Sequence, residues 1–456
     1  MKNPIRQPRQ QKATIKTAIP GPLSKSLRQR EDQHLAPGLQ NFALLAGIAV
    51  KEASGSAITD VDGNTFIDII GGIGVNALGH SHPAYVQAIQ TQVETSSVGS
   101  FTSEPRVKLF EQLAEHRPGP ALHRVQLYSS GAEAVESALR LAKSHTGKYE
   151  FVSFSGGFHG KTMGVLSLMG SDFKNGFGPM LPGCHIAPYA DCYRCPLKLD
   201  YPSCGLACVE ATRRQVKQNS SGKIAAFLIE PMQGTAGNVI PPKEFLPAIK
   251  EVAREFDALL IVDEMITGFG RTGEYWSAWH SGVEADIITI GKQFGGGFPI
   301  SGIISTDEIA SAKPWSDPSG SSSSYGGNPL AAAAASACLG IIDDEALVDN
   351  CRRVGEYFLE RIADWVERFS FVGDVRGAGL FIGMDLVSDK NTKEPLSKVS
   401  CRRIFDECLR RGLLTMTYTP RVRIQPAMTI DEGTIDGVVA ILAEVFEQAD
   451  REGWAK

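Results

Sequence analysis

The sequence has no apolar run long enough to cross a membrane and no excess of charge of one sign. A bilayer-spanning helix needs about 20 consecutive apolar residues, whereas the longest apolar stretch, residues 330–342, is alanine-rich and is typical of a buried helix. A net charge of -5 on 456 residues offers no general attraction to nucleic acid. We therefore expect no membrane and no nucleic-acid partner, which leaves small-molecule chemistry.

The first 30 residues have no acidic side chain and lack the apolar core of a secretory signal. We interpret residues 1–35 as a basic, solvated arm that lies over a partner subunit, in preference to a targeting peptide. Nine cysteines without a secretory signal indicate a reducing, cytoplasmic location and not a disulfide framework.

Length and periodicity together predict two interwoven domains. The chain is 43% hydrophobic and 21% charged, as in globular proteins, and is long enough for two or three domains. Over residues 80–335, helical patterns alternate with short apolar strands, which predicts a large domain with a mostly parallel sheet covered on both faces. Residues 36–79 contain a turn and a strand of a β-hairpin, and residues 336–456 have charged helices around short strands. We assign both segments to a smaller α+β domain.

Two short apolar runs each end in a charged residue. Residues 258–262 and 287–291 are too short and too β-branched for helices, and Asp263 and Lys292 follow them directly. The carboxyl ends of strands are where open α/β sheets bind ligands. A lysine that forms a Schiff base and an aspartate that keeps a ring nitrogen protonated are the pair that pyridoxal phosphate chemistry requires.

A helix is predicted to begin at Ser130. Ser130 and Glu133 have the spacing of a capping box, and Val135 and Leu139 continue a helical apolar stripe. The glycine at position 131 would let a phosphate approach the first-turn amides, where the helix dipole favours negative charge.

The order of these and other motifs resembles the class III, or ω-amino acid, aminotransferases, which are fold type I pyridoxal phosphate enzymes. The resemblance covers roughly residues 45–430 and so most of the chain. Its motifs are Gly79-His80-Ser81-His82-Pro83, Ser130-Gly131-Ala132-Glu133-Ala134, Phe158-His159-Gly160, Glu230-Pro231-Met232-Gln233-Gly234, Asp263-Glu264, Gly268-Phe269-Gly270-Arg271-Thr272-Gly273, Gly291-Lys292 and Gly326-Gly327-Asn328-Pro329.

The resemblance implies catalytic roles for two residues. Lys292 would hold the cofactor as a Schiff base and then move a proton between substrate and cofactor carbons. Asp263 would keep the pyridine nitrogen protonated, because a nearby carboxylate favours the cation.

The resemblance also implies a set of cofactor contacts. Phe158 and Met265 would press on opposite faces of the ring, which fixes its plane. Ser324, where the family usually has threonine, would reach the phosphate from the neighbouring subunit, so the enzyme would be a homodimer or a dimer of dimers. The other implied cofactor contacts are Ser130, Gly131 and Ala132 at the phosphate, and His159 and Glu230 near the ring.

Substrate recognition departs from the 4-aminobutyrate enzymes of the family. Arg423 matches the arginine that binds a 2-oxo acid carboxylate, but the glutamate that pairs with that arginine is replaced by Thr235. Lys161 stands where these enzymes often have an arginine for the distal carboxylate. Ile73 would line the substrate side, and Gln233 would organise the pocket floor.

Four of the nine cysteines lie within 17 residues, outside these motifs. Cys192 and Cys195 form a C-x2-C pair, a usual half-site for zinc or an iron-sulfur cluster. Cys204 and Cys208, however, have C-x3-C spacing and follow after only eight residues, so we favour reduced structural cysteines and expect no metal.

Three functions fit the sequence. The first is an aminotransferase that moves an amino group from an ω-amine or amino acid, as in 4-aminobutyrate enzymes, to a 2-oxo acid by ping-pong half-reactions. The second is a racemase or aminomutase of the same fold, which the threonine at position 235 also permits. The third is a non-catalytic relative, against which the intact Lys292 and Asp263 argue.

Overall fold

A computed structural model of the chain describes residues 10–454, and its contacts divide into two compact units. The first unit combines residues 1–83 with residues 345–456, and the second comprises residues 84–344. Residues 1–9 of the expected basic arm lie outside the described part. The helix α11 (Pro329–Asp344) spans the boundary that we predicted between residues 335 and 336, and it lies whole within the second unit.

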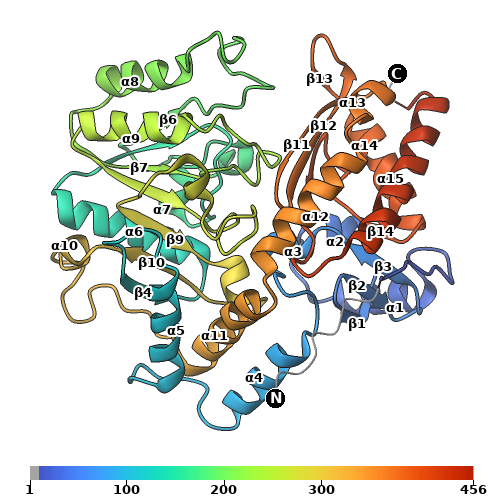
Figure 1. The fold of residues 1–456 in the computed structure, drawn as a ribbon, viewed down its shortest axis with the longest axis horizontal. Coiled ribbons are helices and arrows are strands. Elements are labelled where there is room, and N and C mark those ends of the chain that lie inside the picture. The colour runs from blue at the N-terminus through green and yellow to red at the C-terminus, as the bar shows by residue number, and fades with distance from the viewer. Residues whose placement is uncertain (1–9, 455–456) are drawn as a thin grey trace. The chain divides into compact units, whose positions relative to one another are not determined.

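The second unit is built around a seven-stranded sheet of order β4-β10-β9-β8-β7-β5-β6 (Figure 1). From β9 to β6 all neighbouring strands are parallel, and β10 runs antiparallel to both β4 and β9. This confirms the predicted mostly parallel sheet. Its strands are β4 (Arg124–Tyr128), β5 (Glu150–Phe154), β6 (Cys184–Ala187), β7 (Ile224–Ile229), β8 (Leu259–Asp263), β9 (Ile287–Ile290) and β10 (Ser301–Ser305).

Helices cover both faces of this sheet, which explains why its inner strands are apolar at nearly every position. Strand β7 is buried throughout. Its Ala226 belongs to the apolar cluster that contains the inner stripe of α6 (Gly131–Thr146). The next residue, Phe227, points to the other face, where its ring lies 6.4 Å from that of Phe256 at the end of α9 (Phe245–Glu255). In Figure 1, α6 and α9 lie on opposite sides of β7.

Further helices complete the second unit. Among them, α5 packs against α11, which buries the alanine-rich stretch as expected. The remaining helices are α4 (Pro83–Val93), α5 (Glu104–Glu115), α7 (Met163–Ser167), α8 (Ala207–Asn219), α10 (Asp307–Ala310), and the 3-10 helices η1 (Asp172–Lys174), η2 (Ser277–Ser281) and η3 (Lys292–Gly295).

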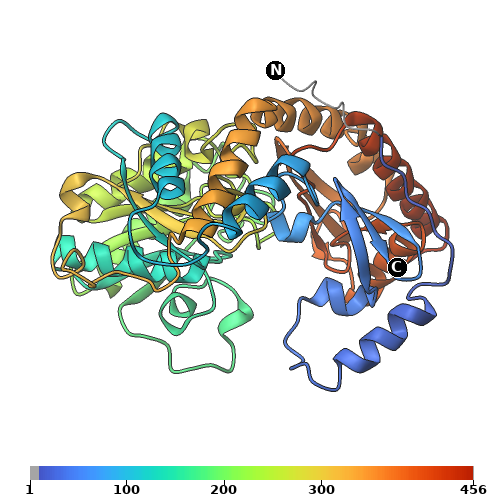
Figure 2. The ribbon, with the colours of Figure 1, turned by 90° about the horizontal axis from the view of Figure 1, so that it is seen from below.

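The first unit joins segments from both ends of the chain, which are coloured blue and orange to red in Figure 2. The expected hairpin forms from β2 and β3, and β3 then pairs in parallel with β14 through Ile67 and Leu413. A second sheet has β12 paired antiparallel with β11, β13 and β15. The strands are β1 (Val50–Ser54), β2 (Ala57–Asp60), β3 (Thr65–Asp68), β11 (Val372–Ala378), β12 (Phe381–Asp389), β13 (Glu394–Pro395), β14 (Leu413–Leu414) and β15 (Arg421–Ile424).

The described part of the basic arm is attached to this unit. Thr14 forms an antiparallel bridge with Thr65, and the carboxylate of Asp62 accepts hydrogen bonds from the amides of Leu23 and Ser24 at the start of α1, at 2.8 and 2.9 Å. A carboxylate stabilises a helix at this end. The helices of the first unit are α1 (Pro22–Glu31), α2 (Asn41–Ala46), α3 (Gly71–Gly74), α12 (Leu347–Arg361), α13 (Trp365–Arg368), α14 (Lys398–Arg410) and α15 (Glu432–Arg451).

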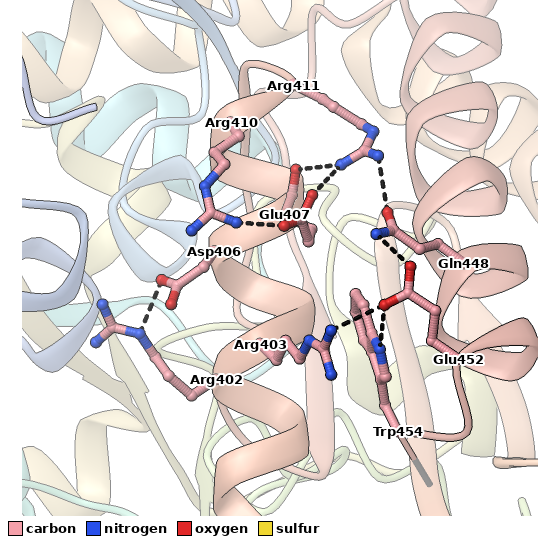
Figure 3. A network of polar contacts seen from close by, with 9 residues as sticks. All are labelled: Arg402, Arg403, Asp406, Glu407, Arg410, Arg411, Gln448, Glu452 and Trp454. Atoms are coloured by element: carbon pink, nitrogen blue, oxygen red, sulfur yellow. Dashed lines mark hydrogen bonds and ion pairs between the residues drawn. The ribbon is translucent and has the colours of Figure 1, made fainter. Parts of the chain in front are cut away.

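A network of charged side chains fastens α15 and the residues after it to α14 (Figure 3). Arg411 donates to Gln448 at 2.9 Å, and Arg403 donates to Glu452 at 2.8 Å. Glu452 also accepts from the indole of Trp454, which is buried under the Arg403 guanidinium. Exposed ion pairs stabilise a protein by less than about 1 kcal/mol each, so this network positions Glu452 and Trp454 more than it stabilises the fold.

Candidate active site

Asp263 closes β8 and is held as an ionised carboxylate. It is 1% exposed. Its Oδ2 accepts a hydrogen bond from Nδ1 of His159 at 2.7 Å, and its Oδ1 accepts from Oγ1 of Thr289 at 2.9 Å and from the amide of Met265 at 3.1 Å. Burial alone would raise the Asp263 pKa, but the hydrogen bond to His159 and the positive charge of Lys292 bring the pKa below its ordinary value.

Lys292 begins η3 two residues after Ile290, the last residue of β9, the strand next to β8. Its φ of 46° lies in the left-handed region, which is uncommon for a residue with a side chain. A side chain on the preceding residue, Gly291, would meet the sulfur of Met265 at 2.5 Å. Met265 therefore packs directly on the backbone that leads into Lys292, and the carboxylate and the amine face the same end of the sheet.

The start of α6 also lies against Met265. An added side chain at Gly131 would meet the same sulfur at 3.1 Å. Ser130 is the N-cap as predicted, and its Oγ accepts from the amide of Glu133 at 3.3 Å. The Glu133 carboxylate accepts in return from the amide of Ser129 at 3.0 Å, one residue earlier than in a capping box.

Phe158 and His159 reach the site on a loop after β5. The amide of Phe158 donates to Oε1 of Glu230 at 2.8 Å, while the amide of Gly234 donates to Oε2 at 2.9 Å. Burial raises the Glu230 pKa, and the Asp263 charge adds to that effect. A side chain at Gly160 would collide with Ala132, so this loop also touches the first turn of α6.

Lys161 and Gln233 lie at the edge of this group. The ammonium of Lys161 stands 4.9 Å from the ring centre of Phe173 and 6.0 Å from that of Phe158. The two rings meet edge to face at 5.5 Å. Gln233 is buried, and its amide donates to the carbonyl of Ser155 at 2.8 Å.

Ile73 and Arg423 both belong to the first unit. Ile73 has a φ of 64° in the short turn α3, and an added side chain at Gly71 of that turn would strike the carbonyl of Gln425. Ile73 packs on the same apolar cluster as Tyr418. Burial raises the Tyr418 pKa, and the positive charge of Arg423 opposes that rise.

Ser324 is exposed, on the loop between α10 and α11. The second unit thus brings together Lys292, Asp263, Met265, Phe158, His159, Glu230 and the residues 130–132. Thr289 is the contact that the sequence interpretation missed. The signal in the sequence is that Thr289 is the single polar residue of the apolar strand β9. The strand register then places it opposite Asp263.

The four cysteines outside the site line one cavity together with Tyr189, Leu197 and Tyr201. They are free thiols, and burial together with the neighbouring thiols raises the pKa of Cys192 to about 11. Within residues 10–454, no three histidine, cysteine or acidic side chains are arranged so that they could hold a metal ion.

A family model for class III aminotransferases matches residues 41–446. The chain belongs to this family. The leucine/methionine racemase of Thermococcus litoralis is 34% identical over 86% of this chain and 88% of its own length. The 4-aminobutyrate aminotransferase of Mycobacterium tuberculosis is 34% identical over 96% of this chain and 99% of its own length. A solved structure of an amine transaminase from an uncultivated Pseudomonas species, in its pyridoxal phosphate-bound form, is also similar. It superposes with a TM-score of 0.85 at 30% identity and covers 91% of this chain and 98% of its own.

Membership confirms the predicted family and fold type I, and with them pyridoxal phosphate as the cofactor of this class III aminotransferase. Among the described residues, no helix has the length and apolar character to cross a bilayer.

Proposed function

We propose that this class III enzyme transfers an amino group from an ω-amine or amino acid to a 2-oxo acid in two ping-pong half-reactions. The observation that carries the proposal is the ionised Asp263 carboxylate, fixed from three sides at the end of β8, beside Lys292 at the end of β9. A bound pyridoxal phosphate supplies an electron sink for the carbanion that deprotonation leaves.

The side chains at the site fit that cofactor. Asp263 would hold a proton on the ring nitrogen, because the carboxylate is buried and ionised. The helix start at Ser130 offers amides and the positive end of a dipole to the phosphate, and Gly131 keeps that approach open. Lys292 Nζ would attach the aldehyde and, once released, carry the proton to and from the substrate carbon.

Two cations are candidates for binding substrate carboxylates. Arg423 would bind the 2-oxo acid as a bidentate partner, while Lys161 would act as a less directional point charge for a donor such as 4-aminobutyrate. Because Thr235 cannot neutralise an arginine, a donor with its own carboxylate fits better than an uncharged amine. Ile73 would then border the aliphatic part of the donor, and Gln233 the floor of the pocket.

We also propose that the working enzyme is a homodimer or a dimer of dimers in the cytoplasm. Large apolar side chains of the second unit are exposed, including Phe101 at 91%, Tyr325 at 66% and Phe177 at 60%. Covering apolar side chains of this size with a partner removes them from water, which is favourable. Ser324, next to Tyr325, would contact the cofactor phosphate of the partner. The nine free thiols support a reducing compartment.

A racemase is the second candidate. It is favoured by the 34% identity to a leucine/methionine racemase and by Thr235 in place of the glutamate of 4-aminobutyrate enzymes. A racemase needs the same lysine and aspartate but no 2-oxo acid.

The experiment that separates these functions adds donors to the purified, cofactor-loaded protein without any acceptor. The panel contains 4-aminobutyrate, ornithine, ω-amines and α-amino acids. An aminotransferase loses the yellow absorbance of bound pyridoxal phosphate in one half-reaction and regains it on addition of 2-oxoglutarate. A racemase keeps the absorbance and changes the optical rotation of an α-amino acid.

The Lys292→Ala variant is the control for catalysis, since it should bind cofactor and lack both activities. Wild-type protein that binds no pyridoxal phosphate, or a Lys292→Ala variant with full activity, would contradict the proposed function.

A further inference from the structure

Ser324 lies in the second half of the loop between α10 and α11, in the segment of residues 321–328. The first residue of this segment, Ser321, is held in a group of three buried hydroxyls. Oη of Tyr128 lies 2.6 Å from Oγ of Ser321, and Oγ of Ser137 lies 3.0 Å from the same atom. Tyr128 and Ser137 are also hydrogen bonded to each other, and Tyr128 reaches the carbonyl of Ser321 at 3.2 Å. All three residues are at most 7% exposed. We call them the hydroxyl cluster.

Two further donors close this cluster. The indole of Trp315 donates to Oγ of Ser137 at 3.0 Å, and the guanidinium of Arg140 donates to the carbonyl of Gly320 at 3.0 Å and to Oγ of Ser321 at 3.5 Å. Burial raises the Tyr128 pKa, so the phenol stays neutral and remains a donor. Buried hydroxyls are costly unless bonded, and Oγ of Ser321 gives the hydroxyls of Tyr128 and Ser137 a further partner.

The second end of the loop is held by backbone contact. An added side chain at Gly326 would strike the carbonyl of Leu127, the neighbour of Tyr128 on β4. Asn328 then donates to the carbonyl of Tyr325 at 2.7 Å and accepts from the amide of Ala331, at the start of α11. Ser324 lies between these two anchors, on an exposed stretch whose ends are fixed.

The hydroxyl cluster is also part of the framework of the chain's own phosphate site. Tyr128 ends β4, two residues before the N-cap Ser130, and Ser137 lies on α6, about two helical turns after that N-cap. The same helix therefore offers its first turn to one phosphate and holds, through Ser137, the loop that carries Ser324.

We propose that the hydroxyl cluster of Tyr128, Ser137 and Ser321 is a positioning device that holds Ser324 ready for the cofactor phosphate of a second copy of the chain. This inference rests on the proposed function. A loop that is ordered before the ligand arrives loses less conformational freedom on binding, so the phosphate is bound more tightly. Ser321 is a positioning residue that touches no cofactor itself and acts only through Ser324.

The test measures reversible cofactor binding in the Lys292→Ala protein, where no covalent bond forms and no turnover is needed. Dissociation constants are determined for pyridoxal phosphate and for pyridoxal, which lacks the phosphate. Ser324→Ala should weaken pyridoxal phosphate about tenfold, the effect of one lost hydrogen bond to a charged group, and leave pyridoxal unchanged. Ser321→Ala should weaken pyridoxal phosphate binding by a smaller factor, about threefold, the cost of ordering one side chain on binding, also without effect on pyridoxal.

A double-mutant cycle distinguishes positioning from a general structural effect. If Ser321 acts through Ser324, the Ser321→Ala change should have no further effect in the Ser324→Ala protein. Tyr128→Phe keeps the ring and removes one hydroxyl of the cluster, so it should reproduce the Ser321→Ala result even if the latter protein is hard to prepare. Ser322→Ala is the matched control, since its exposed hydroxyl contacts only the carbonyl of Ser319.

Each contrary result has a definite meaning. Additive effects of Ser321→Ala and Ser324→Ala, or an unchanged affinity in both Ser321→Ala and Tyr128→Phe, would overturn the positioning role. An unchanged affinity in Ser324→Ala would overturn it too, because nothing would remain to be positioned. The proposed function fails separately, if the protein with an intact Lys292 forms no absorbing complex with pyridoxal phosphate.

Discussion

Replacing Thr289 by valine should test whether Asp263 works by its charge or by its exact orientation. Valine has nearly the same shape as threonine, so the change removes the hydroxyl that donates to Oδ1 at 2.9 Å and little else. Oδ1 keeps the amide of Met265, and Oδ2 keeps His159. The carboxylate thus loses one of its three hydrogen bonds while remaining buried.

The magnitude follows from that one bond. A hydrogen bond to a charged group stabilises a protein by about 1.5–3 kcal/mol, and one pKa unit corresponds to about 1.4 kcal/mol. The Asp263 pKa should therefore rise by about one to two units. Because the wild-type pKa lies below the ordinary value of 3.8, the carboxylate stays ionised at pH 7.5. We expect kcat/KM at pH 7.5 to fall less than about tenfold, whereas Asp263→Asn should lose far more.

The pH dependence has a definite sign. A carboxylate whose pKa is lowered on folding adds stability above its unfolded pKa, and that stability is lost as pH falls through the folded pKa. Thr289→Val should therefore reduce the free energy of unfolding by about 1.5–3 kcal/mol near neutral pH. The difference from wild type should shrink in acid, where both proteins have protonated Asp263. Urea denaturation at several pH values measures it.

Thr212→Val is the matched control. Thr212 is also buried, and its Oγ1 donates at 2.8 Å to the neutral carbonyl of Cys208 on α8. This variant should lose about 1 kcal/mol of stability without a pH-dependent difference from wild type and without change in kcat/KM. Equal pH profiles for the two variants, or a loss of activity in Thr289→Val as large as in Asp263→Asn, would refute the reasoning.

Three further predictions concern separate parts of the protein. Arg423→Ala should raise the Kd of 2-oxoglutarate by an amount that corresponds to about 2–4 kcal/mol. Titration of the pyridoxamine form with 2-oxoglutarate measures this Kd, and an unchanged value would place carboxylate recognition elsewhere. Burial raises the Glu264 pKa from 4.5 to about 7, so between these pH values the folded protein holds a proton that the unfolded chain releases. The free energy of unfolding should therefore fall as pH rises through this window. Between pH 5 and 7.5, the Tm of Glu264→Gln should fall less than the Tm of the wild type. Gly291→Ala should impair cofactor binding because its methyl group meets the Met265 sulfur at 2.5 Å; Met265→Ala should restore part of it, and failure to do so would mean that another contact is responsible.

Local patterns were sufficient for the elements that carry the site. The apolar runs before Asp263 and Lys292 are buried strands, and Ser130 caps the helix predicted after it. These features depend on residues close in sequence, whose periodicity and capping chemistry are readable without a partner.

Long-range pairings could not be predicted in the same way. The reversed strand β10 and the parallel pairing of Ile67 with Leu413 depend on which segments meet, and a strand's own pattern does not name its neighbour. For the same reason, the sequence shows Thr289 only as part of an apolar run, whereas the strand register of the structure places it opposite Asp263.

The residues proposed to bind the cofactor are held more rigidly than those proposed to bind the donor. Asp263 is buried at a strand end and bonded from three sides, so its chemistry is fixed by the sheet. Lys161 instead stands over Phe173, which is 47% exposed in a short 3-10 helix. Binding residues on loops diverge more readily than those on a rigid scaffold. If Lys161 binds the donor as proposed, exchanging the segment around Phe173 should change the choice of donor and leave the chemistry at Asp263 intact.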